Sequence, residues 1–129
     1  DNSGNLVNCS NLNLNPNNPN PLSSPTGIAF NNGYAYILNS ITSSYIICSA
    51  DTSGINVSSC SQPYTTAPHL FAPFGIAFNN GFAYITQSDY PMGNSYLQCS
   101  VGSNGILINC VENQTSPAVL SIPKGIAFN

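Results

Sequence analysis

Five cysteines are the residues whose types and spacing most clearly suggest a chemistry. Cys48 and Cys60 lie on either side of an Asp-Thr-Ser-Gly sequence, and Cys99 and Cys110 on either side of Gly-Ser-Asn-Gly. Positions that face each other across the turn of an antiparallel hairpin lie within disulfide range. We therefore expect the disulfides Cys48–Cys60 and Cys99–Cys110. A zinc site is a poor alternative, because no histidine or further close cysteine pair accompanies them.

Three Asn-x-Ser/Thr sequons are a second candidate chemistry, N-glycosylation at Asn8, Asn56 and Asn113. An asparagine-rich chain produces such triplets by chance, so each one alone is weak. All three fall in the last part of the repeat unit described below. A glycan would be tolerated on an outer strand or on the loop beyond it.

The remaining reactive side chains form no catalytic pattern. His69 is the only histidine and has no neighbouring serine, cysteine or aspartate pattern, so we interpret it as a loop residue. Asp89 is interpreted as a solvated turn residue, and the few scattered acids do not suffice for a calcium site. We predict no catalytic residue, no metal and no cofactor. The tyrosines are expected to pack within sheets and not to form a sugar-binding platform: Tyr34, Tyr36, Tyr84 and Tyr96.

The composition excludes several classes of partner. Charged residues make up 4% of the 129 residues, against about 25% in a typical soluble domain, and a single Lys or Arg is present. Nucleic-acid binding needs several cationic contacts, so we expect none. No apolar run approaches the length of a spanning helix, so we expect no membrane insertion. With 42% hydrophobic residues the chain can still bury a core.

An internal repeat is the strongest feature of the sequence. Residues 27–37, Gly-Ile-Ala-Phe-Asn-Asn-Gly-Tyr-Ala-Tyr-Ile, recur at 75–85 with a single Tyr-to-Phe change, and 125–129 begin the same sequence again. A proline precedes each glycine by two positions. Cys9, Cys60 and Cys110 follow the same period of about 50 residues. The chain is thus divided into 1–24, the end of a preceding unit with an Asn/Pro-rich loop; 25–72 and 73–122, two units; and 123–129, the start of another.

Each unit is predicted to form four short antiparallel strands. In the second unit these are 75–78, 82–86, 96–101 and 106–110, with tight turns at 79–81 and 102–105 where Asn and Gly tolerate positive φ. No stretch has the periodicity of an amphipathic helix. The predicted class is all-β, with tandem four-stranded antiparallel blades of a β-propeller. Glycine and alanine in the first strand suit the crowded axis of such a fold.

The Pro-x-Gly-Ile-Ala-Phe segments followed by Tyr-Ala-Tyr-Ile-Leu-Asn or Phe-Ala-Tyr-Ile-Thr-Gln resemble the YVTN and NHL-type β-propeller repeats of extracellular bacterial proteins. The resemblance covers nearly the whole chain outside residues 11–20. It implies a propeller fold, and a function as scaffold, binding module or, in lactonase-like relatives, enzyme. The cysteine pair in each unit and the near-absence of charge depart from the usual pattern.

Cys9 has no partner within this segment, since by the repeat its mate would precede residue 1. We expect a partial propeller, an excerpt of a longer repeat chain or a subunit completed by neighbours, because a blade cannot bury both faces alone. Its partners would be further repeats or neighbouring copies of the same chain. The predicted function is a non-enzymatic, secreted or cell-surface scaffold, such as a fibre subunit. The alternatives are a propeller that binds carbohydrate or protein and, third, a lactonase-like hydrolase.

Overall fold

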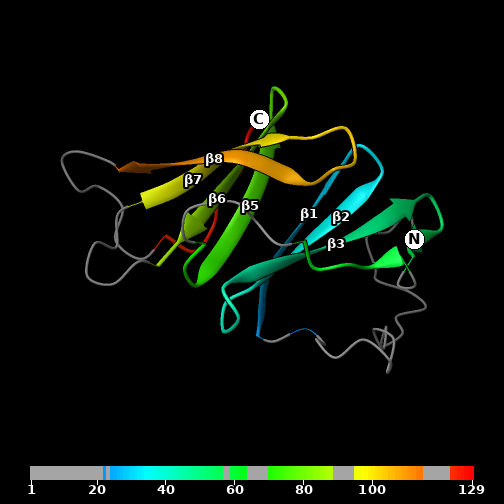
Figure 1. Cartoon of the computed structure of the whole chain (residues 1–129), viewed down its shortest axis with the longest axis horizontal. Helices are drawn as coiled ribbons and strands as arrows, with labels where there is room; N and C mark the ends of the chain where they lie inside the picture. Colours follow the sequence, from blue (N-terminus) through cyan, green and yellow to red (C-terminus); the bar gives the residue numbers. More distant parts are fainter. Residues whose placement is uncertain (1–21, 23, 57–58, 64–69, 89–94, 115–122) are drawn as a thin grey trace.

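The chain folds into two antiparallel β-sheets of four strands each, which follow one another in the sequence. The computed structural model describes residues 22, 24–56, 59–63, 70–88, 95–114 and 123–129. Strands lie side by side in sequence order within each sheet (Figure 1). The predicted all-β class with four-stranded antiparallel sheets is confirmed. The first sheet contains β1 (Pro25–Asn31), β2 (Tyr34–Asn39), β3 (Ser44–Asp51) and β4 (Gly54–Ile55), and the second contains β5 (Pro73–Asn79), β6 (Phe82–Gln87), β7 (Ser95–Val101) and β8 (Leu107–Gln114).

Asn-Gly turns join the first two strands of both sheets. Asn32 and Gly33 have φ of 46° and 78°, and Asn80 and Gly81 have φ of 50° and 80°. Two successive residues with positive φ match the right-handed twist of the strands that they connect, and Asn and Gly adopt that conformation most readily. The same turn sequence therefore produces the same hairpin twice.

The two sheets also share their strand register. Gly27 pairs with Leu38 across β1 and β2, and Gly75 pairs with Thr86 across β5 and β6. Both first strands have an irregularity directly after their proline, which has no N–H to donate to the ladder. The third strands pair with the second strands at Cys48 and Cys99, each opposite an alanine.

The outer strands differ from the expected pattern. In the first sheet β4 has only two residues, and pairing with β3 resumes at an isolated bridge between Ile47 and Ser61. The backbone N–H of Ser49 donates to the Ser59 hydroxyl at 2.8 Å, where a regular ladder would offer a carbonyl. Serine side chains thus replace part of the fourth strand. In the second sheet β8 is longer than predicted and runs to Gln114.

The main apolar core lies between the two sheets. Alternate residues of a strand point to the same face, so β2 and β3 present one face to the second sheet and the other face away from it. β1 and β5 pack against each other beside this core (Figure 1). A smaller cluster covers the opposite face of the first sheet around Ile37, Ile46 and Cys48. The buried members of the main core are Tyr36, Leu38, Tyr45, Ile47, Leu70, Ile76, Ala83, Ile85, Leu97, Cys99, Leu107 and Cys110.

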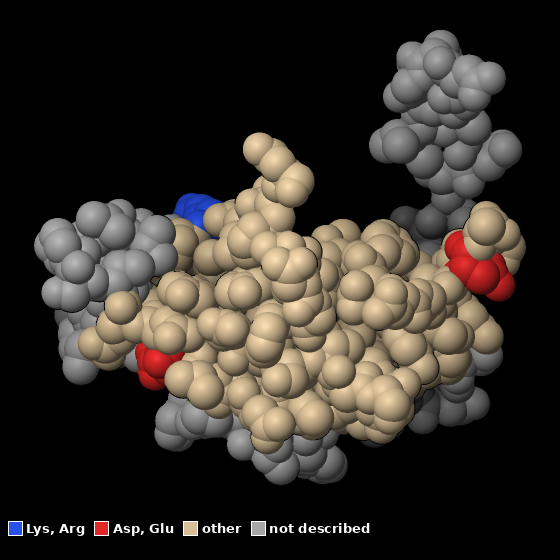
Figure 2. Space-filling view, turned by 90° about the horizontal axis from the view of Figure 1, so that it is seen from above, with Lys and Arg blue, Asp and Glu red and all other residues tan. Residues whose placement is uncertain are grey.

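The surface carries very little charge. Asp51, Glu112 and Lys124 are the acidic and basic residues within the part of the chain that the structure describes. The face drawn in Figure 2 is correspondingly almost without coloured charged atoms. Among the described residues, none belongs to a helix with the length and apolarity needed to cross a membrane.

Candidate functional site

Both predicted disulfides are present in the structure. Cys48 and Cys60 are bonded with their Cα atoms 4.1 Å apart, and Cys99 and Cys110 with theirs 3.9 Å apart. Each bond joins the third strand of a sheet to the segment beyond its last turn. The disulfides therefore close loops of similar length at corresponding places in the two sheets.

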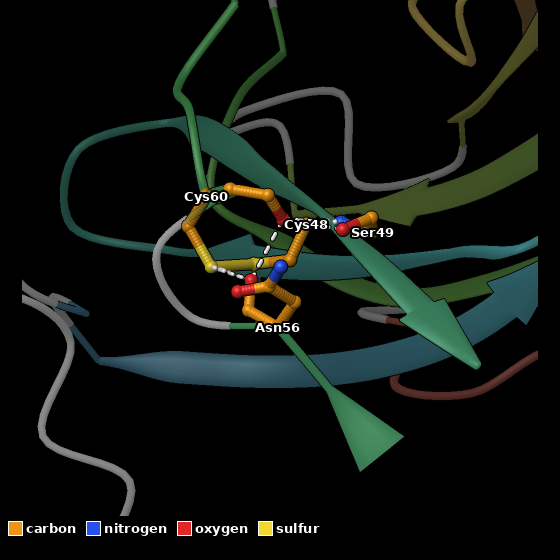
Figure 3. The surroundings of a disulfide bond; sticks show 5 residues. Cys48, Ser49, Asn56 and Cys60 are labelled. Atoms are coloured by element: carbon orange, nitrogen blue, oxygen red, sulfur yellow. Dashed lines mark hydrogen bonds between the residues drawn. A yellow bond between two sulfur atoms is a disulfide. The ribbon is translucent and has the colours of Figure 1, made fainter. Parts of the chain in front are cut away.

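The Cys48–Cys60 disulfide stands beside the irregular end of the first sheet (Figure 3). The carbonyl oxygen of Asn56 accepts a hydrogen bond from the Ser59 hydroxyl at 2.7 Å and lies 3.8 Å from the Cys60 sulfur. The backbone N–H of Asn56 donates to the Ser49 carbonyl at 2.8 Å. Cys60 is half-buried, whereas Cys48 is 1% exposed. The bond thus secures the segment that has too few ladder hydrogen bonds of its own.

The Cys99–Cys110 disulfide lies in the core and not on the exposed surface of the second sheet. Cys99 is 0% and Cys110 8% exposed, and both belong to the core between the sheets. The reason is which face of the second sheet Cys99 lies on. Cys99 is paired with Ala83 on the neighbouring strand, and both side chains point toward the first sheet. This disulfide consequently forms part of the surface on which the first sheet packs.

Tyr36 and Tyr45 attach the first sheet to the second through their hydroxyl groups. Both side chains are fully buried, and their rings stack with centroids 6.3 Å apart. The Tyr36 hydroxyl donates to the carbonyl oxygen of Gly105 at 2.8 Å. The Tyr45 hydroxyl accepts from the backbone N–H of Leu107 at 2.9 Å. Because buried polar groups need partners, these two bonds fix where the β7–β8 hairpin lies over the first sheet.

Burial sets the ionisation of these two phenols. The pKa of Tyr36 is raised to about 12, chiefly by desolvation and further by the neighbouring Tyr45 and Tyr34, against a smaller lowering by the hydrogen bond with Asn31. Burial likewise raises the pKa of Tyr45, against the smaller effect of the Leu107 N–H. Both phenols are therefore protonated and neutral at ordinary pH, which suits a structural contact and not proton transfer.

Two glycines allow the first strands to approach closely. A Cβ atom on Gly27 would lie 2.6 Å from the carbonyl oxygen of Phe74, and one on Gly75 would lie 3.0 Å from the Cα atom of Gly125. A larger residue would collide with backbone at Gly27 and would make an unusually tight contact at Gly75. The Thr26 hydroxyl also donates to the Pro73 carbonyl across the same junction. Gly27 and Gly75 therefore let successive units approach each other closely, and only at Gly27 would an added Cβ force the backbone to shift.

The last described segment, 123–129, approaches the second sheet as the second sheet approaches the first. Phe78 packs on Tyr36 with ring centroids 4.7 Å apart, and Phe128 packs on Tyr84 with centroids 4.9 Å apart. Tyr84 and Tyr96 lie 6.2 Å apart, as the Tyr36 and Tyr45 rings do at 6.3 Å. The tyrosine pair of the second sheet is only half-buried. The same aromatic contact thus occurs twice, one repeat apart.

A hollow opens beside the junction, between the β1–β2 turn and the β7–β8 turn. Its volume is about 290 Å³, and no charged residue lines it. Its walls offer amide, hydroxyl and phenol groups together with backbone. These are groups that can hydrogen-bond a neutral ligand. The lining residues are Asn31, Asn32, Tyr34, Gly81, Val101, Gly102, Ser103 and Gly105.

The sequons occupy the outer part of each sheet where the structure describes them. Asn56 directly follows β4 and is exposed, and Asn113 lies near the end of β8 and is half-buried. The Asn113 side chain donates to the Val111 carbonyl at 3.4 Å. Cys9, Asn8, His69 and Asp89 lie outside the described residues. Within the described ranges, no three His, Cys, Asp or Glu side chains gather closely enough to hold a metal ion.

Gln87 is a buried polar residue that sequence analysis did not single out. It is 1% exposed, accepts the Phe71 N–H at 3.2 Å and donates to the Ser95 hydroxyl at 3.2 Å and the Glu112 carboxylate at 3.4 Å. It therefore ties the chain before β5 to the start of β7. Asn39, 2% exposed, holds the corresponding place opposite a proline in the first sheet. The signal in the sequence was an amide at the end of the second strand in both repeats.

These features define a small all-β, disulfide-bonded protein in which two similar sheets are joined by tyrosines and closely approaching glycines. Two disulfides in a domain of this size are compatible with an extracellular protein. No protein-family model matches the chain, no curated protein is significantly similar to it in sequence, and no solved structure matches its fold.

Proposed function

We propose that the chain is a non-enzymatic, extracellular scaffold built from stacked β-sheet repeats that form consecutive blades of a β-propeller. One observation supports this most: the contact of Phe78 with Tyr36 recurs one repeat later as that of Phe128 with Tyr84. A contact that recurs with the sequence period is what a fold of laterally packed units requires. The resemblance of the Gly-Ile-Ala-Phe segments to YVTN and NHL-type repeats agrees with this arrangement.

The chemistry of the junction favours a structural function over an enzymatic one. The residues that meet there are glycines, apolar side chains and phenols whose pKa is raised by burial. Such groups join sheets by packing and neutral hydrogen bonds, and they are poorly suited to exchanging protons at neutral pH.

An extracellular location is supported by the disulfides and by the exposed sequon. Disulfides persist in oxidising compartments, and the exposed Asn56 leaves room for a glycan beside the Cys48–Cys60 bond. When the chain is secreted from a eukaryotic host, we expect a mass increase that enzymatic deglycosylation removes and that Asn56→Gln reduces. Unchanged masses would contradict the glycosylation part of the proposal.

Adding a repeat tests the scaffold. Residues 75–124 are duplicated by inserting a second copy between Lys124 and Gly125, which preserves the period of the sequence. We expect a higher free energy of unfolding, measured with a chemical denaturant, because each new unit adds an interface. The control is a Gly/Ser-rich insertion of equal length at the same point, which adds chain without an interface.

The scaffold proposal fails if the duplicated chain unfolds at the same denaturant concentration as the parent and proteases remove the inserted unit. It also fails if the duplication and the Gly/Ser insertion have equal effects. Electron microscopy of the duplicated and longer chains then distinguishes closed rings from filaments.

A carbohydrate-binding module is the second candidate, and the hollow beside the junction favours it. Asn32, Tyr34 and Ser103 bring amide, phenol and hydroxyl groups to one cavity of about 290 Å³, and sugars are bound by such groups together with aromatic faces. Glycan-array binding that is lost in Tyr34→Ala would support this function. No bound glycan on the array would contradict it.

A further inference from the structure

Three Asn-Gly pairs lie in turns of the structure. In such a pair the backbone nitrogen of the glycine can attack the side-chain amide carbon of the asparagine, because glycine has no side chain to obstruct the approach. All three pairs contain the same reacting groups, so a difference in their reactivity has to come from the fold. The pairs are Asn32-Gly33, Asn80-Gly81 and Asn104-Gly105.

The first two pairs are exposed, at the tips of the β1–β2 and β5–β6 hairpins. The glycine carbonyls accept backbone N–H groups of the third strands at 2.8 and 3.3 Å. Within the described residues, no backbone hydrogen bond engages the N–H of Gly33 or of Gly81. Asn80 and Gly81 are exposed although the first sheet packs beside them, so the exposure belongs to the turn itself. The attacking nitrogen is therefore accessible, and a small local opening of the tip suffices to bring it to the amide carbon.

The third pair is held closed by the junction between the sheets. The N–H of Gly105 donates to the Gly102 carbonyl at 2.9 Å, so the attacking nitrogen is engaged. The Oδ1 atom of Asn104 accepts the N–H of Ile106 at 3.2 Å, which fixes the side chain. Gly105 is also buried, and its carbonyl accepts the Tyr36 hydroxyl. Reaction at this turn would require these hydrogen bonds to break and the two sheets to loosen.

We propose that Asn32 and Asn80 are sites of spontaneous deamidation in the folded protein, and that the fold protects Asn104 from the same reaction. The proposal concerns a covalent modification of the two exposed hairpin tips. It does not depend on the scaffold function, because it uses only the exposure and hydrogen bonding of the three turns.

The reaction needs no enzyme or cofactor, and solvent water is its co-reactant. The glycine nitrogen forms a bond to the asparagine Cγ atom, the Cγ–Nδ2 bond breaks, and the proton of the glycine nitrogen leaves with the amide group as ammonia. Water then opens the resulting cyclic imide. Attack of water at Cγ gives an aspartate. Attack at the backbone carbonyl carbon gives an isoaspartate, in which the main chain continues through the former side chain.

Each conversion adds one negative charge to a surface that has very few. Conversion at both sites takes the formal net charge from −3 to −5. Asn32 also lines the hollow beside the junction, and no charged residue lines that hollow. An aspartate there places a carboxylate among neutral hydrogen-bonding groups. The protein thus acquires charge at two defined points as it ages.

Timed incubation of the folded chain at neutral pH and body temperature tests the proposal. Samples are digested with pepsin at acidic pH, where the reaction is slow, and fragmentation in a mass spectrometer assigns each site. We expect the amide-to-acid mass change to accumulate at Asn32 and Asn80, with heavy oxygen incorporated when the buffer contains heavy-oxygen water. Asn104 should react more slowly by roughly tenfold or more, because its turn must first open.

The reduced chain in denaturant is the reference, since it keeps the three Asn-Gly pairs and loses the fold. There the three sites should react at similar rates. Asn32→Gln is the matched variant: it keeps an amide at the turn, but its longer side chain closes the ring slowly. It should abolish the mass change in its own peptide and leave Asn80 unaffected. Asn80→Gln serves in the same way if Asn32→Gln does not fold.

Equal rates at the three sites of the folded chain overturn the proposal, as does a folded chain in which Asn104 reacts first. Asn32 and Asn80 that react in denaturant but stay intact in the folded chain overturn it as well, because the hairpin tips would then be as protected as the buried turn.

Discussion

The Tyr36 hydroxyl donates a hydrogen bond of 2.8 Å to the carbonyl oxygen of Gly105, which lies in the turn at the far end of the second sheet. Gly105 has a φ of 79°, and a Cβ atom there would lie 2.8 Å from Ile47 and 2.9 Å from the Tyr34 ring. The turn thus presents its backbone to the first sheet because a glycine leaves room for close contact. The Tyr36 hydroxyl and Gly105 thus contribute, with the Tyr45–Leu107 hydrogen bond, to the relative position of the two sheets.

Tyr36→Phe should destabilise the protein, because it leaves the buried Gly105 carbonyl without its partner. We expect a loss of about 1–3 kcal/mol in the free energy of unfolding, measured with a chemical denaturant. Tyr84→Phe is the control, since Tyr84 is the equivalent residue of the second sheet and is only half-buried. Equal losses in the two variants would contradict the importance of the Tyr36–Gly105 bond.

Gly27→Ala should destabilise the junction of the first strands. The new Cβ would lie 2.6 Å from the Phe74 carbonyl oxygen, so the sheets must shift apart, at a typical cost of about 1–3 kcal/mol for overpacking. Gly125→Ala is the matched control from the third repeat, where a Cβ would meet nothing within 4 Å. Comparison of thermal unfolding midpoints checks this, and a harmless Gly27→Ala would show that the strands approach less closely than described.

The two disulfides should differ in their resistance to reductant. Cys60 is half-buried, whereas Cys99 and Cys110 lie in the core between the sheets. Because thiol–disulfide exchange requires access to a sulfur atom, the Cys48–Cys60 bond should be reduced first. Partial reduction, alkylation and peptide mass spectrometry measure the order. Earlier or simultaneous loss of the Cys99–Cys110 bond would be inconsistent with the burial of that pair.

The stability of the junction should fall at alkaline pH. The pKa of Tyr36 is raised to about 12 in the folded chain and is about 10 in the unfolded chain, so the folded state retains this proton to higher pH. The stabilisation is fully present below about pH 10 and is lost as the pH rises toward 12. Denaturant unfolding at a series of pH values checks this. Tyr36→Phe should flatten the decline, and an unchanged slope in that variant would refute the assignment.

Much of the fold could be predicted from the sequence because the decisive signals are local. Asn-Gly turns between alternating aromatic and β-branched residues specify hairpins, and the repeat placed the cysteines opposite each other. The short length of β4 was not predicted. It arises because the Ser59 hydroxyl accepts the hydrogen bond of the Ser49 N–H, which a strand carbonyl would otherwise accept. Repetition of a sequence does not guarantee repetition of its outer strand.

The candidate site was predicted less completely, since it depends on contacts between units. Crowding at the glycines of the first strand was expected in general terms, but the partners of Tyr36 and Tyr45 could not be read from the chain. Both partners are backbone groups of the second sheet, and every residue type carries such groups, so the sequence does not indicate which of them bind a hydroxyl. The burial of Cys99 was missed for a related reason: it depends on which face of the hairpin meets the first sheet.

Because the described part of the molecule has few charged groups, contacts at its surface should depend little on the salt concentration of the solution. Asp51, Glu112 and Lys124 are the charged residues among those described. Dissolved salt therefore has few electrostatic interactions to screen on this surface. Contacts between such surfaces depend on fit and on exclusion of water, and they should persist alike in dilute and in saline surroundings.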